Sequence, residues 1–295
     1  DYKYIRVSKT NSKFGKLLDA EGIDFELEFR IDRKIYDFVL PEKKTVIEID
    51  PTYTHNLLGN HWDKHGMEKL YHVNKSELAN EHGYNCIHIF DWDDWNKIVS
   101  ILSTDIKLYA RDCKIVELQK AAVDKFMEDN HLQGTCKGQR CCYGLINDDT
   151  VVEVMTFGKP RYNRNYEFEL LRLCTKSGYR IVGGASKLFK HFISTCSPSS
   201  IISYCDASKF TGAVYNNMGM NLVRRTDPSK VWSKGSKKIT DNLLRQRGFD
   251  QLFGTDFGKG TSNDDLMLQH GWLPVYDCGQ FVYEWRSLSC ESEIV

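Results

Sequence analysis

Helix-like and strand-like segments occur in two successive series, and this repetition most constrains how the chain can fold. The first series predicts a helix at 12–22, strands at 25–31, 35–40 and 45–50, a helix over 62–83, a strand at 84–90 and a helix at 91–102. After a connector near 105–115 the pattern restarts with a helix, three strands, a glycine-rich turn and helix, a strand, a short helix and a C-terminal extension. At 295 residues the chain therefore predicts two α/β domains, over 1–105 and 115–295.

The charge balance excludes a global electrostatic attraction to nucleic acid or to a membrane surface. Lysine plus arginine and aspartate plus glutamate both number 40, so the formal net charge is zero. A basic binding surface must then be local, and the candidate patches are 159–164, where basic residues alternate with tyrosine, and 224–238. The alternative is that these runs are simply solvated faces.

The ten cysteines are spaced irregularly in a large chain without a signal peptide, which indicates reduced thiols in a cytosolic protein. A metal site in Cys136, Cys141 and Cys142, with Cys113, is the alternative. No apolar run approaches the roughly 20 residues that cross a bilayer, so we expect a soluble chain without membrane contact. Because the chain starts at Asp1 and not at methionine, we expect a missing upstream segment.

Two acidic residues lie on neighbouring strands joined by a short turn. Asp37 is in the strand at 35–40 and Glu48 in the strand at 45–50, so both side chains can project from one edge of the sheet. A carboxylate on a half-buried strand needs a cation, which predicts a Mg²⁺ site formed by Asp37 and Glu48. The alternative is an ion pair of Asp37 with Arg30 or Arg33.

Two histidines and a lysine follow these acids. His55 closes the acidic segment, and His72 and Lys75 share one helix face. A histidine can transfer a proton from an attacking water, and a lysine can hold a phosphate. Isolated surface histidines are common, so the prediction depends on the combination.

The segments "IYDFVLPEKKTVIEIDPTYTH" and "LYHVNKSELANEHGYNCIHIFDWDDW" resemble the nuclease domain of phage homing endonucleases of the EDxHD group. These are similar to the very-short-patch mismatch-repair endonuclease and to the wider PD-(D/E)xK fold. The resemblance implies a metal-binding Asp37 with Glu48 beside it, catalytic His55 and His72, an adjacent Lys75, and a role in the cytoplasm of the infected bacterial host. The family glutamate of the first helix is absent, and the nearby acids that could replace it are Glu21, Glu26 and Glu28.

A glycine pair follows an apolar strand in the second series and opens a helix. The amides freed by Gly183 and Gly184, with the helix N-terminus, can form a cradle for an anion such as pyrophosphate. A plain turn is the alternative. Arg180, Gly183 and Ala185 have the Arg-x-x-Gly-x-Ala spacing that resembles the acyl-CoA loop of the GNAT acetyltransferase fold.

The order of elements over about 115–225 also resembles the GNAT fold. The resemblance implies acetyl-CoA as a ligand, Tyr215 as a general acid, and Glu167 or Glu169 as a base. A second interpretation is that this fold binds the phosphate backbone of double-stranded DNA. The residues for that contact are Lys159, Arg161, Arg164, Arg172, Arg224 and Arg225.

The expected function is thus a Mg²⁺-dependent DNA endonuclease of homing type, whose GNAT-like domain helps to bind double-stranded target DNA. Two alternatives stay open. One is an acyl-CoA-dependent acyltransferase with a degenerate nuclease domain, and the other is a DNA-binding protein without catalysis.

Overall fold

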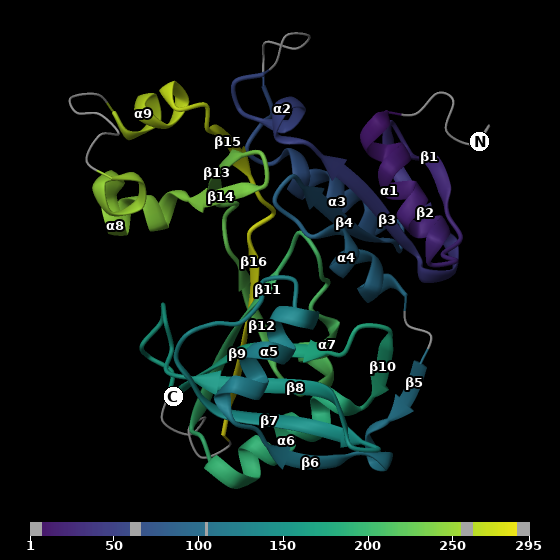
Figure 1. Cartoon of the computed structure of the whole chain (residues 1–295), viewed down its shortest axis with the longest axis vertical. Coiled ribbons are helices and arrows are strands. Elements are labelled where there is room, and N and C mark those ends of the chain that lie inside the picture. Colours follow the sequence, from purple (N-terminus) through teal and green to yellow (C-terminus); the bar gives the residue numbers. More distant parts are fainter. Residues whose placement is uncertain (1–7, 60–65, 104–105, 255–261, 288–295) are drawn as a thin grey trace. The chain divides into compact units, whose positions relative to one another are not determined.

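The computed structural model describes residues 8–59, 66–103, 106–254 and 262–287, and the chain divides into two compact units (Figure 1). Unit 1 comprises 1–93, 206–210 and 226–280, and unit 2 comprises 94–205, 211–225 and 281–295. The sequence predicted one boundary near 105–115. The structure instead returns residues 226–280 to the first unit, so both units are discontinuous in sequence.

Unit 1 contains a four-stranded sheet in the order β1-β2-β3-β4. Its strands are β1 (Glu26–Ile31), β2 (Lys34–Leu40), β3 (Thr45–Asp50) and β4 (Asn85–Phe90). The pairs β1–β2 and β2–β3 are antiparallel, and β3–β4 is parallel. All six residues of β3 are buried, so its two carboxylates lie in the interior.

Three short helices flank this sheet: α1 (Lys9–Ala20), α2 (Thr52–His55) and α3 (Tyr71–Glu81). Ser8 caps α1 by accepting a hydrogen bond from the Asn11 amide, and Phe14 packs edge-on against Phe38 of β2. The helix expected at 62–83 is α3, and the part of that prediction over 62–65 lies outside the described residues.

The returning segment of unit 1 forms a second, antiparallel sheet in the order β14-β13-β15. Its elements are β13 (Lys230–Lys234), β14 (Lys237–Thr240), α8 (Asp241–Phe253), α9 (Asn263–Gln269) and β15 (Leu273–Tyr276). Trp232 is the centre of a small core that these elements enclose. The Leu57 amide, just after α2, donates to the Pro274 carbonyl of β15, which ties the second sheet to the first within unit 1.

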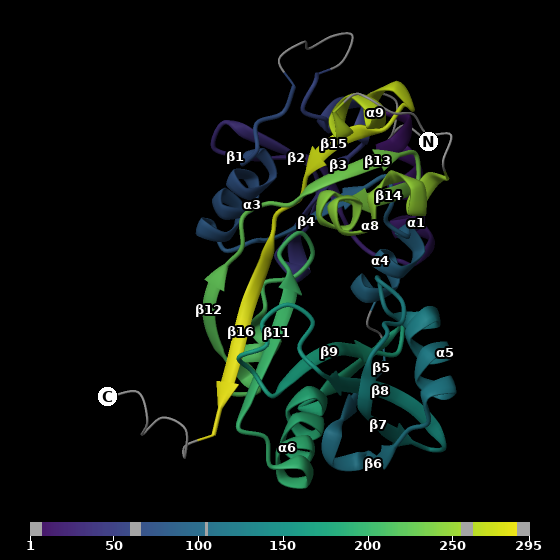
Figure 2. The ribbon, with the colours of Figure 1, turned by 90° about the vertical axis from the view of Figure 1, so that its left-hand side faces the viewer.

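Unit 2 is built on a seven-stranded sheet in the order β12-β16-β11-β9-β8-β7-β6 (Figure 2). In chain order its strands are β6 (Lys114–Glu117), β7 (Gln139–Asn147), β8 (Thr150–Gly158), β9 (Phe168–Thr175), β11 (Ser200–Asp206), β12 (Asn221–Arg225) and β16 (Gln280–Arg286). Neighbours from β6 to β9 are antiparallel, whereas β9 and β11 are parallel.

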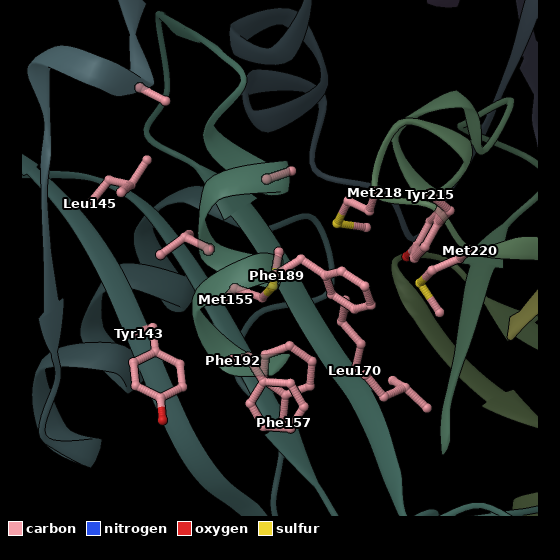
Figure 3. Packing of buried hydrophobic residues seen from close by; sticks show 14 of the residues in the cluster. Tyr143, Leu145, Met155, Phe157, Leu170, Phe189, Phe192, Tyr215, Met218 and Met220 are labelled. Atoms are coloured by element: carbon pink, nitrogen blue, oxygen red, sulfur yellow. The ribbon is translucent and has the colours of Figure 1, made fainter. Parts of the chain in front are cut away.

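Helices cover both faces of this sheet. Val123 and Met127 of α5 (Lys120–Asn130) pack with Cys142 on one face. The apolar residues of α6 (Gly184–Cys196) and α7 (Ala213–Asn217) pack on the other face, where the rings of Phe157 and Phe192 stack with centroids 3.5 Å apart (Figure 3). The other elements of this unit include α4 (Trp95–Leu102) and the parallel pair β5 (Ile106–Tyr109) and β10 (Tyr179–Val182).

The alternation of β7 bears on the predicted cysteine cluster. Cys141 packs in the core beneath α6, whereas Cys142 packs in the core beneath α5 on the opposite face. Adjacent strand residues cannot direct both thiols to one ion, so this arrangement does not form the metal site. The described cysteines are free thiols. Within the described part of the chain, no helix is long and apolar enough to cross a membrane.

Candidate functional site

The glycine turn of unit 2 begins helix α6. Gly183 caps the helix with a left-handed backbone, at φ 79° and ψ 6°, which a residue with a side chain adopts only under strain. The first-turn amides of Gly184, Ala185 and Ser186 have no partners within the helix and carry its partial positive charge. Arg180 is exposed three residues before the turn. This arrangement can bind an anion.

The parallel strands β9 and β11 separate close to this helix. Their register covers only Phe168–Leu170 against Ile201–Ser203, although the strands continue to Thr175 and Asp206. At the last paired position the Ser203 hydroxyl donates to the Leu170 carbonyl at 3.0 Å. A parallel sheet that stops pairing in its middle leaves backbone groups for another partner.

Tyr215 of α7 lies at this point of separation. Burial raises the pKa of its hydroxyl, and a hydrogen bond with Ser203 offsets that effect only in part. Its ring stacks on Tyr283 with centroids 4.7 Å apart (Figure 3 shows Tyr215 beside Met220). Ser186 in the first turn of α6 donates to the Asn217 carbonyl at 3.1 Å, which holds α7 beside the glycine turn. Tyr215 is therefore a protonated donor near the turn.

A buried carboxyl was not predicted at this turn. Glu153 of β8 lies so close to Gly184 that a Cβ at Gly184 would be 1.7 Å from Glu153 Oε2. Gly184 is thus required for packing as well as for the turn. Burial raises the pKa of Glu153 to about 8, although a hydrogen bond from Thr175 opposes the shift. A neutral carboxyl beside the turn does not repel an anion.

The two predicted bases are already engaged. Glu167 Oε2 accepts hydrogen bonds from the Ser199 amide and hydroxyl at 2.7 and 2.9 Å. Glu169 is fully buried and accepts from the Arg161 amide and guanidinium. Both carboxylates thus bind other groups of the protein, and their role as a base stays a prediction.

The residues predicted to contact DNA differ in availability. Arg161 is paired with Glu169, and Arg172 is half-buried and donates to the Gly134 and Leu171 carbonyls. Lys159, Arg164 and Arg224 are exposed, and Arg225 lies over the Phe281 ring. Binding to double-stranded DNA stays a prediction.

The acids of unit 1 are held by protein groups. Asp37 accepts hydrogen bonds from the Asn11 side chain at 2.7 Å and from the Ile49 amide at 2.8 Å, and not from the arginines considered as its partners. Burial raises the pKa of Asp37, and these two bonds oppose the shift. Lys75 Nζ lies 2.5 Å from Glu48 Oε2 and also donates to the Ile35 carbonyl. Lys75 thus neutralises Glu48 in the interior and does not face a phosphate.

The predicted histidines do meet, but around a different acid. His55 Nδ1 lies 3.2 Å from His72 Nε2 and 3.1 Å from Asp50 Oδ1. Asp50 also accepts from His88 Nδ1 at 2.7 Å. Burial would raise the pKa of Asp50, but the three imidazoles hold it below its usual value.

Asp50 and His88 were missed as site residues, and the sequence carries a signal only for Asp50. Glu48 and Asp50 are two apart on one strand and therefore share a face of the sheet. Glu48 pairs with His88 in the parallel register of β3 and β4. Asp91, at the end of β4, accepts a hydrogen bond from the Thr52 amide and so fixes the start of α2.

Comparison with known proteins gave matches to solved structures alone; no family model and no curated protein matches. An acetyltransferase of Bacillus subtilis in complex with CoA is 13% identical, with a TM-score of 0.32, over 60% of this chain and 99% of its own. A GNAT-family acetyltransferase of Bacillus cereus is 12% identical, with a TM-score of 0.31, over 60% of this chain and 98% of its own. An N-acetyltransferase of Staphylococcus aureus is 11% identical, with a TM-score of 0.33, over 59% of this chain and 98% of its own.

The structures that match about 60% of this chain are acetyltransferases, one of them described as a member of the GNAT family. Likeness of this degree establishes neither a family nor an activity for this chain. The nuclease fold predicted for the first domain stays a prediction.

The prediction of a Mg²⁺-dependent DNA endonuclease is wrong. The solved structures that match the chain are acetyltransferases, among them complexes with CoA or acetyl-CoA. The geometry of unit 1 leaves no place for the ion, because Lys75 forms an ion pair with Glu48, and the Ile49 amide and the Asn11 side chain donate to Asp37. The associated expectations of a hydrolase and of homing are withdrawn, and so is the Mg²⁺ site of Asp37 and Glu48.

Proposed function

We propose that unit 2 is an acyl-CoA-dependent acyltransferase domain. The observation that carries this proposal is that an anion-binding helix start, the separation of two parallel strands and a buried tyrosine hydroxyl occur together. Each of these features is common alone. Their combination fits a ligand with a pyrophosphate at one end and a thioester at the other.

The glycine turn fits the pyrophosphate. The amides of Gly184, Ala185 and Ser186 point out of the first turn of α6, and the left-handed Gly183 directs the chain into that turn. Arg180 adds a positive charge beside the turn without an ion pair among the described residues. Acetyl-CoA, when bound, supplies an activated acyl group.

The strand separation and Tyr215 fit the reacting end. The unpaired parts of β9 and β11 offer backbone donors and acceptors to the amide groups of a CoA arm. Because burial raises the pKa of Tyr215, its hydroxyl stays protonated at neutral pH and can donate a proton to a leaving sulfur. Glu167 and Glu169 are engaged elsewhere, so the acceptor must arrive with an already neutral amine or meet a different base.

Titration calorimetry of the full chain with acetyl-CoA tests the proposal. We expect saturable binding that weakens at least about tenfold in Arg180→Glu, because a carboxylate then faces the phosphates. Lys125→Glu is the matched control, since it makes the same charge change at an exposed site on α5. A change at Gly184 is a poorer test because any side chain there collides with Glu153.

Tyr215→Phe separates binding from catalysis. We expect it to bind acetyl-CoA as the wild type does and to lose acyl transfer to amine acceptors. A wild-type chain that does not bind acetyl-CoA, or that binds it equally well after Arg180→Glu, contradicts the proposal.

A further inference from the structure

Three metal-ligand atoms meet in unit 1 where strand β3 ends. Asp50 Oδ1, His55 Nδ1 and His72 Nε2 form a triangle with sides of 3.1, 3.2 and 3.7 Å. A tetrahedral zinc ion with bonds of about 2.0–2.2 Å places its ligand atoms about 3.3 Å apart. One ion fits this triangle with small adjustments of the side chains.

The hydrogen bond of His72 directs its lone pair into the triangle. His72 Nδ1 lies 2.8 Å from the Tyr276 carbonyl, which can only accept, so Nδ1 carries the proton. In the neutral ring Nε2 then bears the lone pair, and Nε2 is the atom that lies 3.2 Å from His55 Nδ1 and 3.7 Å from Asp50 Oδ1. A backbone carbonyl that fixes the second ring nitrogen is the usual support for a metal-binding histidine.

The two oxygens of Asp50 have different environments. His88 donates to Oδ2 at 2.7 Å, and the other His88 nitrogen lies 3.0 Å from the Ser76 hydroxyl. Oδ1 is fully buried and accepts no hydrogen bond from any residue that the structure describes, although His55 Nδ1 is 3.1 Å away. A buried carboxylate oxygen without a donor is costly unless it has another ligand.

We propose that Asp50, His55 and His72 bind one divalent transition-metal ion of the zinc type. Two imidazoles and one carboxylate suit zinc and its neighbours, whereas Mg²⁺ prefers oxygen ligands throughout. The fourth coordination position is open to water, since the side chain of His55 is 13% exposed while Asp50 and His72 are closed off. This site is independent of the acyltransferase proposal, because it lies entirely within unit 1.

Metal binding by the full chain tests the proposal after treatment with a chelator. We expect one equivalent of Zn²⁺ to bind, one equivalent of Co²⁺ to give the visible d–d absorption of a four-coordinate ion, and excess Mg²⁺ not to compete. Saturating Zn²⁺ should also raise the melting temperature, because the ion binds only the folded site.

Matched histidine variants distinguish this site from adventitious binding to thiols. His55→Ala should weaken Zn²⁺ binding at least about 100-fold and abolish the Co²⁺ spectrum, since loss of a ligand exceeds the cost of losing an outer hydrogen bond. His82→Ala is the control, because His82 is exposed at the end of α3 and pairs with Asp32. Circular dichroism of both variants verifies folding. Absence of Zn²⁺ binding to the wild type, or equal binding by His55→Ala, overturns the proposal.

Discussion

Asp50 of unit 1 and Glu153 of unit 2 are buried to a similar degree, yet their protonation states differ. Their exposed fractions are 0% and 4%, and burial raises the pKa of both carboxyls. At Asp50 three imidazoles reverse that effect, so the group is ionised. At Glu153 a hydrogen bond from Thr175 opposes it weakly, and the pKa rises to about 8. The neighbouring charges, and not the depth of burial, determine which buried acid keeps its proton.

The largest effect is expected from removal of the Asp50 charge. Asp50→Asn leaves His88, whose pKa lies well above its usual value, without its carboxylate partner in the interior. We expect the free energy of unfolding to fall by about 3–5 kcal/mol, measured by urea denaturation at pH 7. Asp32→Asn is the control, because Asp32 is 61% exposed and should change stability by less than about 0.5 kcal/mol. Equal effects at both positions would contradict the comparison.

Glu153 should make the free energy of unfolding fall as the pH rises. Its pKa is about 8 when folded and near 4.5 when unfolded, so the folded state binds the extra proton and loses stability as pH rises from about 4.5 to 8. Glu153→Gln cannot titrate and should be more stable than the wild type by about 2–4 kcal/mol at pH 8. Urea denaturation at pH 4.5 and pH 8 measures this difference. A difference that does not change with pH would show that Glu153 is ionised.

The pair of Glu48 and Lys75 is intermediate between these two cases. Burial raises the pKa of Glu48, and Lys75, whose Nζ lies 2.5 Å from Glu48 Oε2, opposes that rise. Lys75→Met should lower the free energy of unfolding by about 2 kcal/mol at pH 7, because the buried Glu48 carboxyl must then take up a proton. Adding Glu48→Gln should recover part of the loss, and this double-mutant cycle measures the coupling. Additive losses would indicate that the two groups do not interact.

The smallest effect is expected at an exposed acid. Asp94 caps α4 by accepting hydrogen bonds from the Asn96 and Lys97 amides. Asp94→Ala should lower the free energy of unfolding by about 1 kcal/mol, and Asp94→Ser should lower it much less, because serine also caps helices. Thermal unfolding of the two variants measures the difference.

The sequence predicted most of the sheet strands, because runs such as 45–50 are apolar and end at turn residues. It predicted that the second series opens with a helix, whereas strand β6 comes first, since a segment of four residues carries little periodicity and becomes a strand only when a partner strand is present. The return of 226–280 to unit 1 was not predicted. Contacts between residues some 200 positions apart, such as His72 with Tyr276, leave no local pattern.

The candidate sites were predicted unequally for a similar reason. The glycine turn was found because its conformation requires glycine locally, at Gly183. The approach of His55 to His72 was predicted, but the acid between them was taken to be Asp37 or Glu48 and is Asp50. Which acid meets the imidazoles depends on the register of β3 against β4, and a single sequence does not reveal that register.

The carbonyl that accepts the hydrogen bond from His72 Nδ1 belongs to Tyr276, which lies in a segment that is synthesised only after most of unit 2. Newly synthesised unit 1 consequently lacks the hydrogen-bond acceptor that orients the His72 ring until the ribosome has passed residue 276. A shortened gene that stops before residue 226 would encode a first unit whose imidazole is no longer oriented, however well its four-stranded sheet forms.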